Sequence, residues 1–261
     1  MDIKKLFMSI HGAVDLGNCI KMIDIVNGTV KIEGTEFNIT LEQYENFIEL
    51  TGANKDDVYF DPKVSIHPFF IYLEGCMIEV HSFEPDMLEF LQIPNRIKVM
   101  THSLRNAIMK KDFISLFGII DKRARIPELV KRLHSIPVEQ VYDVFEYVYT
   151  SSEQGFHLIP KKVIKHIKSY AHLSGSYIES MRLLKQFSND EGKLPIYRGH
   201  NENSNENVSQ AIQSWTLSEN TAKYFATRFK GNHHVEFMIV PVEDILFYFD
   251  GRGEQEVIIF A

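Results

Sequence analysis

The stretch "SWTLSENTAKYFATRF", residues 214–229, decides the fold of the last third of the chain. Its first residues are typical of a strand end, and Ser218 is a residue type that caps helix N-termini. Behind Ser218, apolar residues recur at the spacing of one helix face: Ala222, Phe225, Ala226 and Phe229. We therefore expect a helix that packs against neighbouring strands in a compact α+β core.

Strands are predicted on both sides of this helix. "LPIYRG" (194–199) is a short strand, "HVEFMIVPV" (234–242) is typical of a buried strand, and "EQEVIIF" (254–260) is the last strand. Glu254 and Glu256 would project from the same face of that last strand, because they are two residues apart. Two like charges this close are unfavourable unless a site uses them. The alternative is an exposed strand face that carries two acids.

Residues 101–190 have helical periodicity. In "SIPVEQVYDVFEYVYT" (135–150), Ser135 followed two residues later by a proline predicts a helix start. The stretch from 160 to 187 predicts two further helices with a break near Ser174. Its basic residues are either an anion-binding patch or a solvated helix face: Lys161, Lys162, Lys165 and Lys168.

Residues 1–100 mix strands and short helices, which predicts an accessory α+β domain for contact or support. "CIKMIDIVNGTVKIEGTEFNI" (19–39) predicts a β-ribbon that turns at Asn27–Gly28. "TLEQYENFIELTG" (40–52) predicts a helix that begins with a capping box and ends at a glycine. "FFIYLEGCMIEVHSF" (69–83) predicts two strands around a Glu-Gly turn.

The composition is that of a globular protein with 261 residues, 44% of them hydrophobic, and a formal net charge of −7. This charge gives no general attraction to phosphate backbones. Cys19 and Cys76 lie far apart, and the eleven histidines show no HExxH spacing, so we expect neither a disulfide framework nor a metal site. The N-terminal stretch is a poor signal peptide, and no apolar run is long enough to span a bilayer. We therefore expect a cytoplasmic protein without membrane contact.

Three motifs follow one another in the last third: Arg198–Gly199 at a strand end, Ser214–Thr216 before the helix, and Glu254–Glu256 at the final strand. In this order they resemble the Arg-Ser-Glu class of mono-ADP-ribosyltransferases. The stretch 214–229 is especially similar to the Ser-Thr-Ser strand and following helix of bacterial toxin-like members. The second Ser of that motif matches only Ser218, displaced by one residue.

The resemblance covers roughly residues 125–261 and implies a split-sheet, NAD-binding α+β fold with preceding helices. Together with the periodicity it predicts an accessory domain over residues 1–100 and an ADP-ribosyltransferase domain over residues 101–261. The latter would comprise a helical part (101–190) and an NAD-binding β core (191–261).

The resemblance assigns the two acids different tasks. Cleavage of the bond between nicotinamide and ribose develops positive charge on the sugar, and a nearby carboxylate stabilises it. The class gives this task to the second Glu of the motif, here Glu256. The first Glu, here Glu254, would orient and deprotonate the acceptor.

The remaining motif residues would hold NAD. Arg198 would bind the pyrophosphate or the adjoining ribose, where a planar guanidinium suits better than an ammonium. Ser214 would hydrogen-bond the nicotinamide ribose and hold the catalytic carboxylate, with Thr216 as support. The backbone of Gly199 would approach the nicotinamide amide. Phe225 or its neighbour Tyr224 would stack on the nicotinamide, although core packing explains Phe225 equally well.

The implied activity is transfer of ADP-ribose from NAD to a macromolecular acceptor, with protein arginine favoured over RNA or DNA. Such an enzyme would be an effector of the toxin, toxin–antitoxin or phage-defence kind, with an inhibitory antitoxin as a candidate partner. One alternative is an NAD glycohydrolase, in which water is the acceptor. The other is a non-catalytic interaction module that retains the motif.

Overall fold

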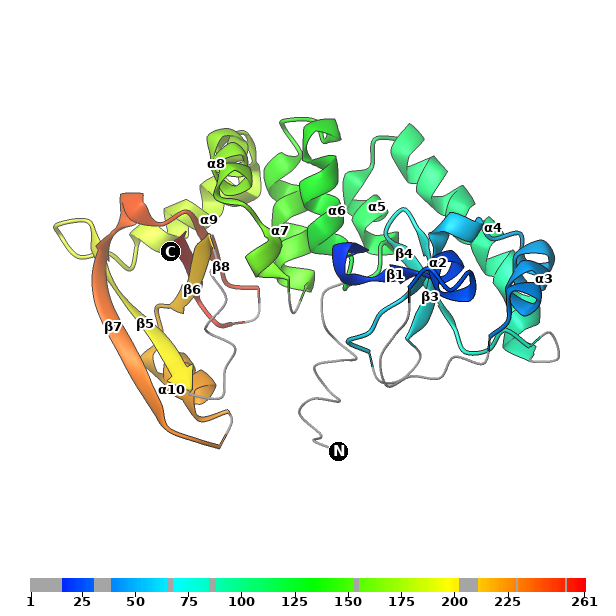
Figure 1. Cartoon of the computed structure of the whole chain (residues 1–261). Coiled ribbons are helices and arrows are strands. Elements are labelled where there is room, and N and C mark those ends of the chain that lie inside the picture. Colours follow the sequence, from blue (N-terminus) through cyan, green and yellow to red (C-terminus); the bar gives the residue numbers. More distant parts are fainter. Residues whose placement is uncertain are drawn as a thin grey trace. The chain divides into compact units, whose positions relative to one another are not determined.

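The computed structural model describes residues 16–30, 39–64, 68–84, 88–152, 155–201, 211–228, 230–251 and 253–261. Over these residues the chain is α+β and contains two antiparallel sheets (Figure 1). None of the described helices combines the length and the apolar character that crossing a membrane requires.

The chain divides into two compact units. The first contains the residues up to Arg132 together with Tyr147–Gly155, and the second contains Leu133–Glu146 and Phe156–Ala261. The sequence predicted a domain boundary at residue 100. The structure instead groups the helices between residues 101 and 132 with the N-terminal sheet.

The first unit contains a four-stranded sheet of order β1-β2-β3-β4 and several helices. Its strands are β1 (Ile20–Lys21), β2 (Val58–Phe60), β3 (Phe69–Leu73) and β4 (Cys76–Val80). Its helices are α2 (Met22–Val26), α3 (Leu41–Thr51), α4 (Leu88–Met109), α5 (Phe113–Ile119) and α6 (Arg125–Arg132). The core of the sheet is built from aromatic and aliphatic side chains, among them Met22, Tyr44, Phe47, Ile71 and Ile78.

Local signals in this unit act as expected at α3 and at the β3–β4 turn. The Thr40 hydroxyl accepts from the Gln43 N–H, the Gln43 side chain accepts from the Thr40 N–H, and Gly52 ends α3 in the left-handed conformation. Strands β3 and β4 pair across the Glu74–Gly75 turn. These predictions are confirmed.

Of the described part of the predicted β-ribbon over residues 19–39, only Ile20–Lys21 is a strand, and it pairs with β2 rather than with a hairpin partner. Met22–Val26 is the helix α2, and the part of the ribbon from 31 to 38 lies outside the described residues. Met22 is fully buried, and the apolar residues around it pack into the same core. Gly28 has a φ of +70°, a conformation that suits the end of a helix as well as a hairpin turn.

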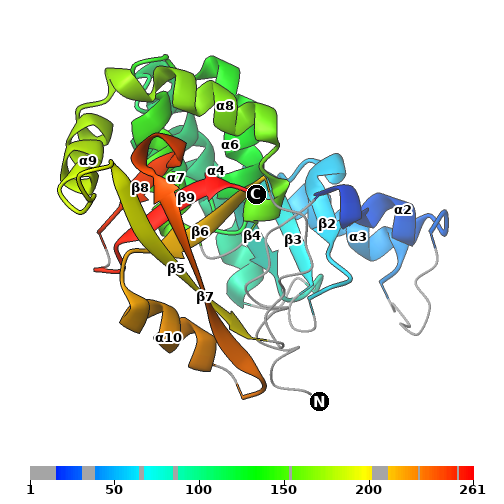
Figure 2. The ribbon, with the colours of Figure 1, turned by 90° about the vertical axis from the view of Figure 1, so that its left-hand side faces the viewer.

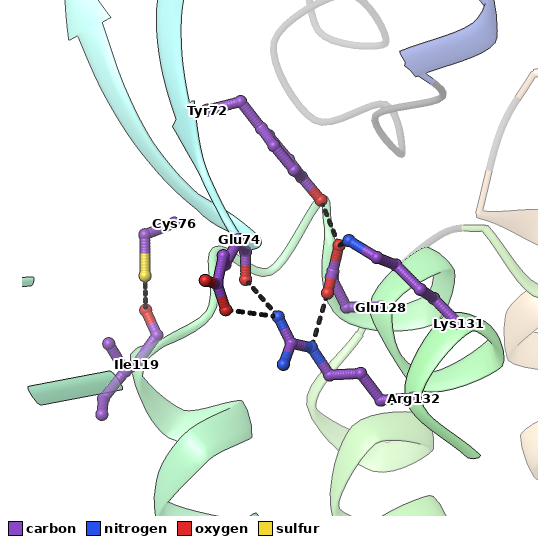
Figure 3. A network of polar contacts seen from close by, with 7 residues as sticks. All are labelled: Tyr72, Glu74, Cys76, Ile119, Glu128, Lys131 and Arg132. Atoms are coloured by element: carbon purple, nitrogen blue, oxygen red, sulfur yellow. Dashed lines mark hydrogen bonds and ion pairs between the residues drawn. The ribbon is translucent and has the colours of Figure 1, made fainter. Parts of the chain in front are cut away.

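A buried carboxylate joins α6 to the sheet of the first unit (Figure 3). The side chain of Glu128 is 2% exposed and accepts hydrogen bonds from the Tyr72 hydroxyl at 2.7 Å and from Arg132 Nε at 2.6 Å. Arg132 also donates to the carboxylate of Glu74 at 3.1 Å, and Lys131 Nζ lies 3.2 Å from Glu128. One acid therefore connects β3, the β3–β4 turn and α6.

These contacts keep the acid ionised. Burial alone would raise the pKa of Glu128, but the hydrogen bonds from Tyr72 and Arg132 and the charges of Arg132 and Lys131 outweigh it. The pKa of Glu128 therefore lies below its ordinary value.

The second unit is built on a five-stranded sheet of order β7-β5-β6-β9-β8. Its strands are β5 (Lys193–Asn201), β6 (Ile212–Thr216), β7 (His233–Pro241), β8 (Phe247–Phe249) and β9 (Glu256–Phe260). Its helices are α8 (Lys161–Tyr170), α9 (Gly175–Lys185) and α10 (Glu219–Thr227), and α7 (Val141–Ser151) crosses the division between the units. Its core contains Leu184, Leu194, Ile196, Trp215, Tyr248 and Val257.

This sheet is split between β5 and β6. Strands β5 and β7 share nine residue pairs and β6 and β9 share five, but β5 and β6 are joined by the single pair Tyr197–Thr216. Figure 2 shows β5 and β7 running together and diverging from β6 and β9. The functional motifs lie on both sides of this fork.

Other predictions for the second unit have mixed outcomes. The expected break near Ser174 is present, and Ser174 caps α9 there. Ser218 caps α10, as expected, by accepting from the Thr221 N–H at 3.2 Å. Helix α7 begins at Val141 rather than at Ser135, because a turn closed by Pro137 precedes it. Strand β7 is largely exposed instead of buried, because it lies at the edge of the sheet.

We predict that Glu128→Gln lowers the free energy of unfolding by about 3 kcal/mol at pH 7, because it leaves Arg132 without its buried counter-charge. The folded-state pKa of Glu128 lies below its ordinary value of 4.5, so the stabilisation is complete above that value and is lost as the pH falls toward the folded-state pKa. Urea titrations at pH 7 and in mild acid measure both effects.

The matched control is Glu179→Gln, which removes a carboxylate from the exposed ion pair with Arg182 and should change stability little. Equal stability of Glu128→Gln and the unsubstituted protein at pH 7 would contradict the assigned network.

Candidate active site

Ser214 and Glu256 lie together on the open sheet of the second unit. Glu256 is the first residue of β9 and pairs with Thr216 of β6, so Ser214 is its diagonal neighbour on the same face. The Ser214 hydroxyl donates a short hydrogen bond to the Glu256 carboxylate. Ser214 is exposed, and Glu256 is partly exposed. The contact expected between these two residues is therefore present at a solvent-accessible position.

Thr216 connects three segments around this pair. Its buried hydroxyl donates to the Glu254 carbonyl at 2.6 Å and accepts from the Ser218 N–H at 3.0 Å. The Leu217 N–H also donates to the Gln255 carbonyl at 3.1 Å. Thr216 thus ties the end of β6 to the start of α10 and to the turn before β9.

Glu254 does not share a strand face with Glu256. Strand β9 begins at Glu256, and Gln255 has a φ of +48°, in the left-handed region. The Gln255 N–H donates to Asp250 Oδ1 at 3.2 Å, so these residues form part of the β8–β9 turn. The expectation of two acids alternating along one strand is wrong, because alternation requires extended backbone.

Arg198 lies on the other branch of the fork. It follows Tyr197, the residue that pairs with Thr216, and it stands opposite Glu236 of β7. Alternation along β5 directs its side chain to the face opposite that of Tyr197. The side chain is partly exposed and has no hydrogen bond or ion pair to any residue in the described ranges. The structure therefore places Arg198 beside the fork without direct contact with Ser214 or Glu256.

Gly199 lets α10 approach β5. A Cβ at this position would lie 2.1 Å from the Ala222 carbonyl oxygen and 2.6 Å from the Ala226 nitrogen. The Asn201 side chain, which is buried, donates to the Ala226 carbonyl at 2.9 Å. Helix α10 therefore occupies the space where a side chain of residue 199 would lie. Nicotinamide cannot approach Gly199 from that side, contrary to what the sequence had led us to expect.

Asn201 was not identified from the sequence. The Asn201 side chain on β5 binds α10. The sequence shows only an amide side chain two residues after Gly199, which does not predict this contact. The expected apolar face of α10 is present at Ala222 and Ala226, which are buried, whereas Phe229 lies outside the described residues.

The aromatic candidates for stacking lie on α10. Phe225 is half-buried, and its ring centroid lies 5.5 Å from that of Tyr224, which is 63% exposed. No described contact joins either ring to Ser214 or Glu256. The stacking role of Phe225 remains a prediction.

The lysines of α8 do not act as one basic patch. Lys168 Nζ donates to the carbonyls of Ile245 at 3.1 Å and Leu246 at 2.8 Å and to the Tyr177 hydroxyl at 2.6 Å. Burial lowers the pKa of Lys168 to about 8. Lys168 therefore supports the chain entering β8, whose Phe249 pairs with Glu256.

In the described part of the chain, the motif residues form no metal site and do not line the surface hollow on α4. Within the described ranges, no three His, Cys, Asp or Glu side chains are placed to hold a metal ion. A surface hollow is lined by α4 residues between Asn95 and Arg105, in the first unit, and includes none of the motif residues.

No protein-family model, curated protein or solved structure matches this chain.

We predict that Gly199→Ala lowers the free energy of unfolding by about 2 kcal/mol or more, because the new methyl group must displace the backbone of α10. Thermal or urea unfolding measures the loss. Gly175→Ala is the matched control, since a Cβ there meets nothing within 4 Å and alanine favours the first turn of α9. Unchanged unfolding of Gly199→Ala would show that α10 does not pack on β5 as described.

Proposed function

We propose that the second unit is a mono-ADP-ribosyltransferase that transfers ADP-ribose from NAD to a macromolecular acceptor. The observation that carries the proposal is the hydrogen bond from Ser214 to Glu256. It joins two of the three motif residues of the Arg-Ser-Glu class at an exposed position. The split between β5 and β6 gives further support, because the resemblance implies a split sheet.

In this proposal Glu256 stabilises the positive charge that develops on the ribose as the bond to nicotinamide breaks. Ser214 holds the carboxylate in one orientation, and its exposed position leaves the hydroxyl within reach of the ribose. Pairing between β6 and β9 fixes both backbones, so the carboxylate needs little reorganisation during the reaction.

Arg198 binds the diphosphate of NAD in this proposal. A guanidinium offers several donors in one plane and suits two phosphate oxygens at once. Its partly exposed position on β5, one residue beyond the Tyr197–Thr216 pair, supports the assignment. Because Arg198 lies on the face opposite that of Tyr197, Thr216 and Glu256, NAD bound by both Arg198 and Glu256 would pass between the two branches of the fork.

Glu254 acts on the acceptor in this proposal. It precedes β9 in a turn, whereas Glu256 is held on the strand, so the two acids have different surroundings. Their different positions suit two tasks, with one carboxylate at the ribose and the other at the acceptor. We favour protein arginine over RNA or DNA, since the net charge is −7. The enzyme would act in the cytoplasm as a toxin-like or phage-defence effector, with an inhibitory antitoxin as partner.

The first test incubates the protein with cell lysate and NAD labelled in its adenylate half. We expect label on macromolecules, and a loss of about 100-fold or more for Glu256→Gln, because the charge that stabilises the ribose is removed. Glu243→Gln, which changes an exposed acid in the same unit, should keep full activity.

Protease-sensitive label identifies a protein acceptor, and nuclease-sensitive label identifies RNA or DNA. Equal labelling by the protein and by Glu256→Gln would overturn the proposal, and so would a failure of NAD to be consumed or to raise the melting temperature.

The second candidate is an NAD glycohydrolase, which the displacement of Glu254 from the strand favours. We predict that Glu254→Gln abolishes transfer but leaves nicotinamide release nearly unchanged, because water needs no positioned acceptor base. Chromatography of nicotinamide beside macromolecular label measures both reactions. If transfer survives this substitution, Glu254 is not the acceptor base; if the unsubstituted protein releases nicotinamide without transfer, the glycohydrolase is the better description.

A further inference from the structure

Strand β7 is an open edge of the second unit's sheet. It pairs with β5 along all nine residues, and no other strand of the described chain pairs with it. The opposite edge is protected, since β8 has three residues, all buried, and packs against α9. Long open edges offer unpaired backbone groups to another strand.

Apolar side chains lie beside this edge on one face. Phe237 is 54% exposed and Ile239 is 59% exposed, and they share a face because they are two residues apart. Their partners on β5 are Tyr197 and Pro195, and the rings of Tyr197 and Phe237 lie 5.3 Å apart. The face therefore carries an apolar strip that reaches the open edge.

The edge carries little of the protection that usually prevents pairing. Natural edges often carry lysine or an internal proline, whereas β7 contains no lysine and its one proline, Pro241, is its last residue. Its one acid, Glu236, is bound to His200 at 2.8 Å. A partner strand would thus meet a mostly neutral, apolar edge.

We propose that β7 pairs antiparallel with β7 of a second copy of this chain. The charges at its two ends support this partner: the strand begins with His233 and His234 just after Lys230, and it is followed by Glu243 and Asp244. Antiparallel pairing brings the basic end of one copy to the acidic end of the other.

The pairing is centred on Phe237. Phe237 then faces its counterpart, and Val235 of each copy stands opposite Ile239 of the other, so the two apolar strips join. Glu236 stands opposite Met238, which keeps the two carboxylates from facing each other. The dimer is a continuous antiparallel sheet, and it does not depend on the proposed reaction.

Sedimentation of the full chain over a range of concentrations tests the dimer. We expect a monomer–dimer equilibrium whose dissociation constant rises about tenfold or more in Phe237→Lys and in Ile239→Lys, because both place a charge in the seam. Ile178→Lys is the matched control, since Ile178 is 56% exposed on α9 and lies away from β7. Circular dichroism and melting temperature confirm that the variants fold.

A cysteine test checks the register. In a Cys19→Ser background, Phe237→Cys should form a disulfide-linked dimer under mild oxidation, because directly opposed residues have Cβ atoms about 5 Å apart. Tyr224→Cys, equally accessible on α10, should not. A monomer at all concentrations, a dimer unaffected by both lysine substitutions, or no selective cross-link would overturn the proposal.

Discussion

The second unit depends on one backbone pair, Tyr197 with Thr216, which joins two strand groups that otherwise diverge. A single pair is weak by itself, so side chains must support the junction. Gly199 and Asn201 bring α10 against β5, and the Thr216 hydroxyl binds main-chain groups on both sides of β6. Packing of α10 therefore supports the β5 branch, and hydrogen bonds of Thr216 support the β6 branch.

The candidate site follows from this construction. Thr216 is the backbone partner of both Tyr197 and Glu256, so it sets the distance between the branch that carries Arg198 and the strand that carries the acid. Its side chain also fixes the carbonyl of Glu254. One buried threonine thus positions residues from four segments, whereas the sequence suggested only a supporting role for it.

The sequence predicted features that are determined locally. The capping box at Thr40 and the Ser218 cap depend on residues three positions apart. The Ser214–Glu256 contact joins residues 42 positions apart, and the resemblance rather than a local signal predicted it. The predictions for Glu254 and β7 are wrong, each for its own reason. Glu254 lies outside β9 because Gln255 adopts a left-handed conformation that ends the extended backbone. Strand β7 is exposed because, in the described sheet, only β5 pairs with it. The sequence assigned Gly199 to ligand binding because it does not show that α10 packs against β5 at this residue.

Two acids of this chain show how surroundings separate a structural carboxylate from a candidate catalytic one. Glu128 is 2% exposed, and Tyr72, Arg132 and Lys131 contact its carboxylate. Two positive charges therefore compensate its charge, and these contacts join α6 to the sheet. Glu256 is partly exposed, and its carboxylate accepts a hydrogen bond from the Ser214 hydroxyl. A carboxylate that is held in one orientation and is accessible from solvent can stabilise positive charge that develops on a bound sugar. This difference in exposure, rather than the spacing of acids in the sequence, supports the proposed role of Glu256.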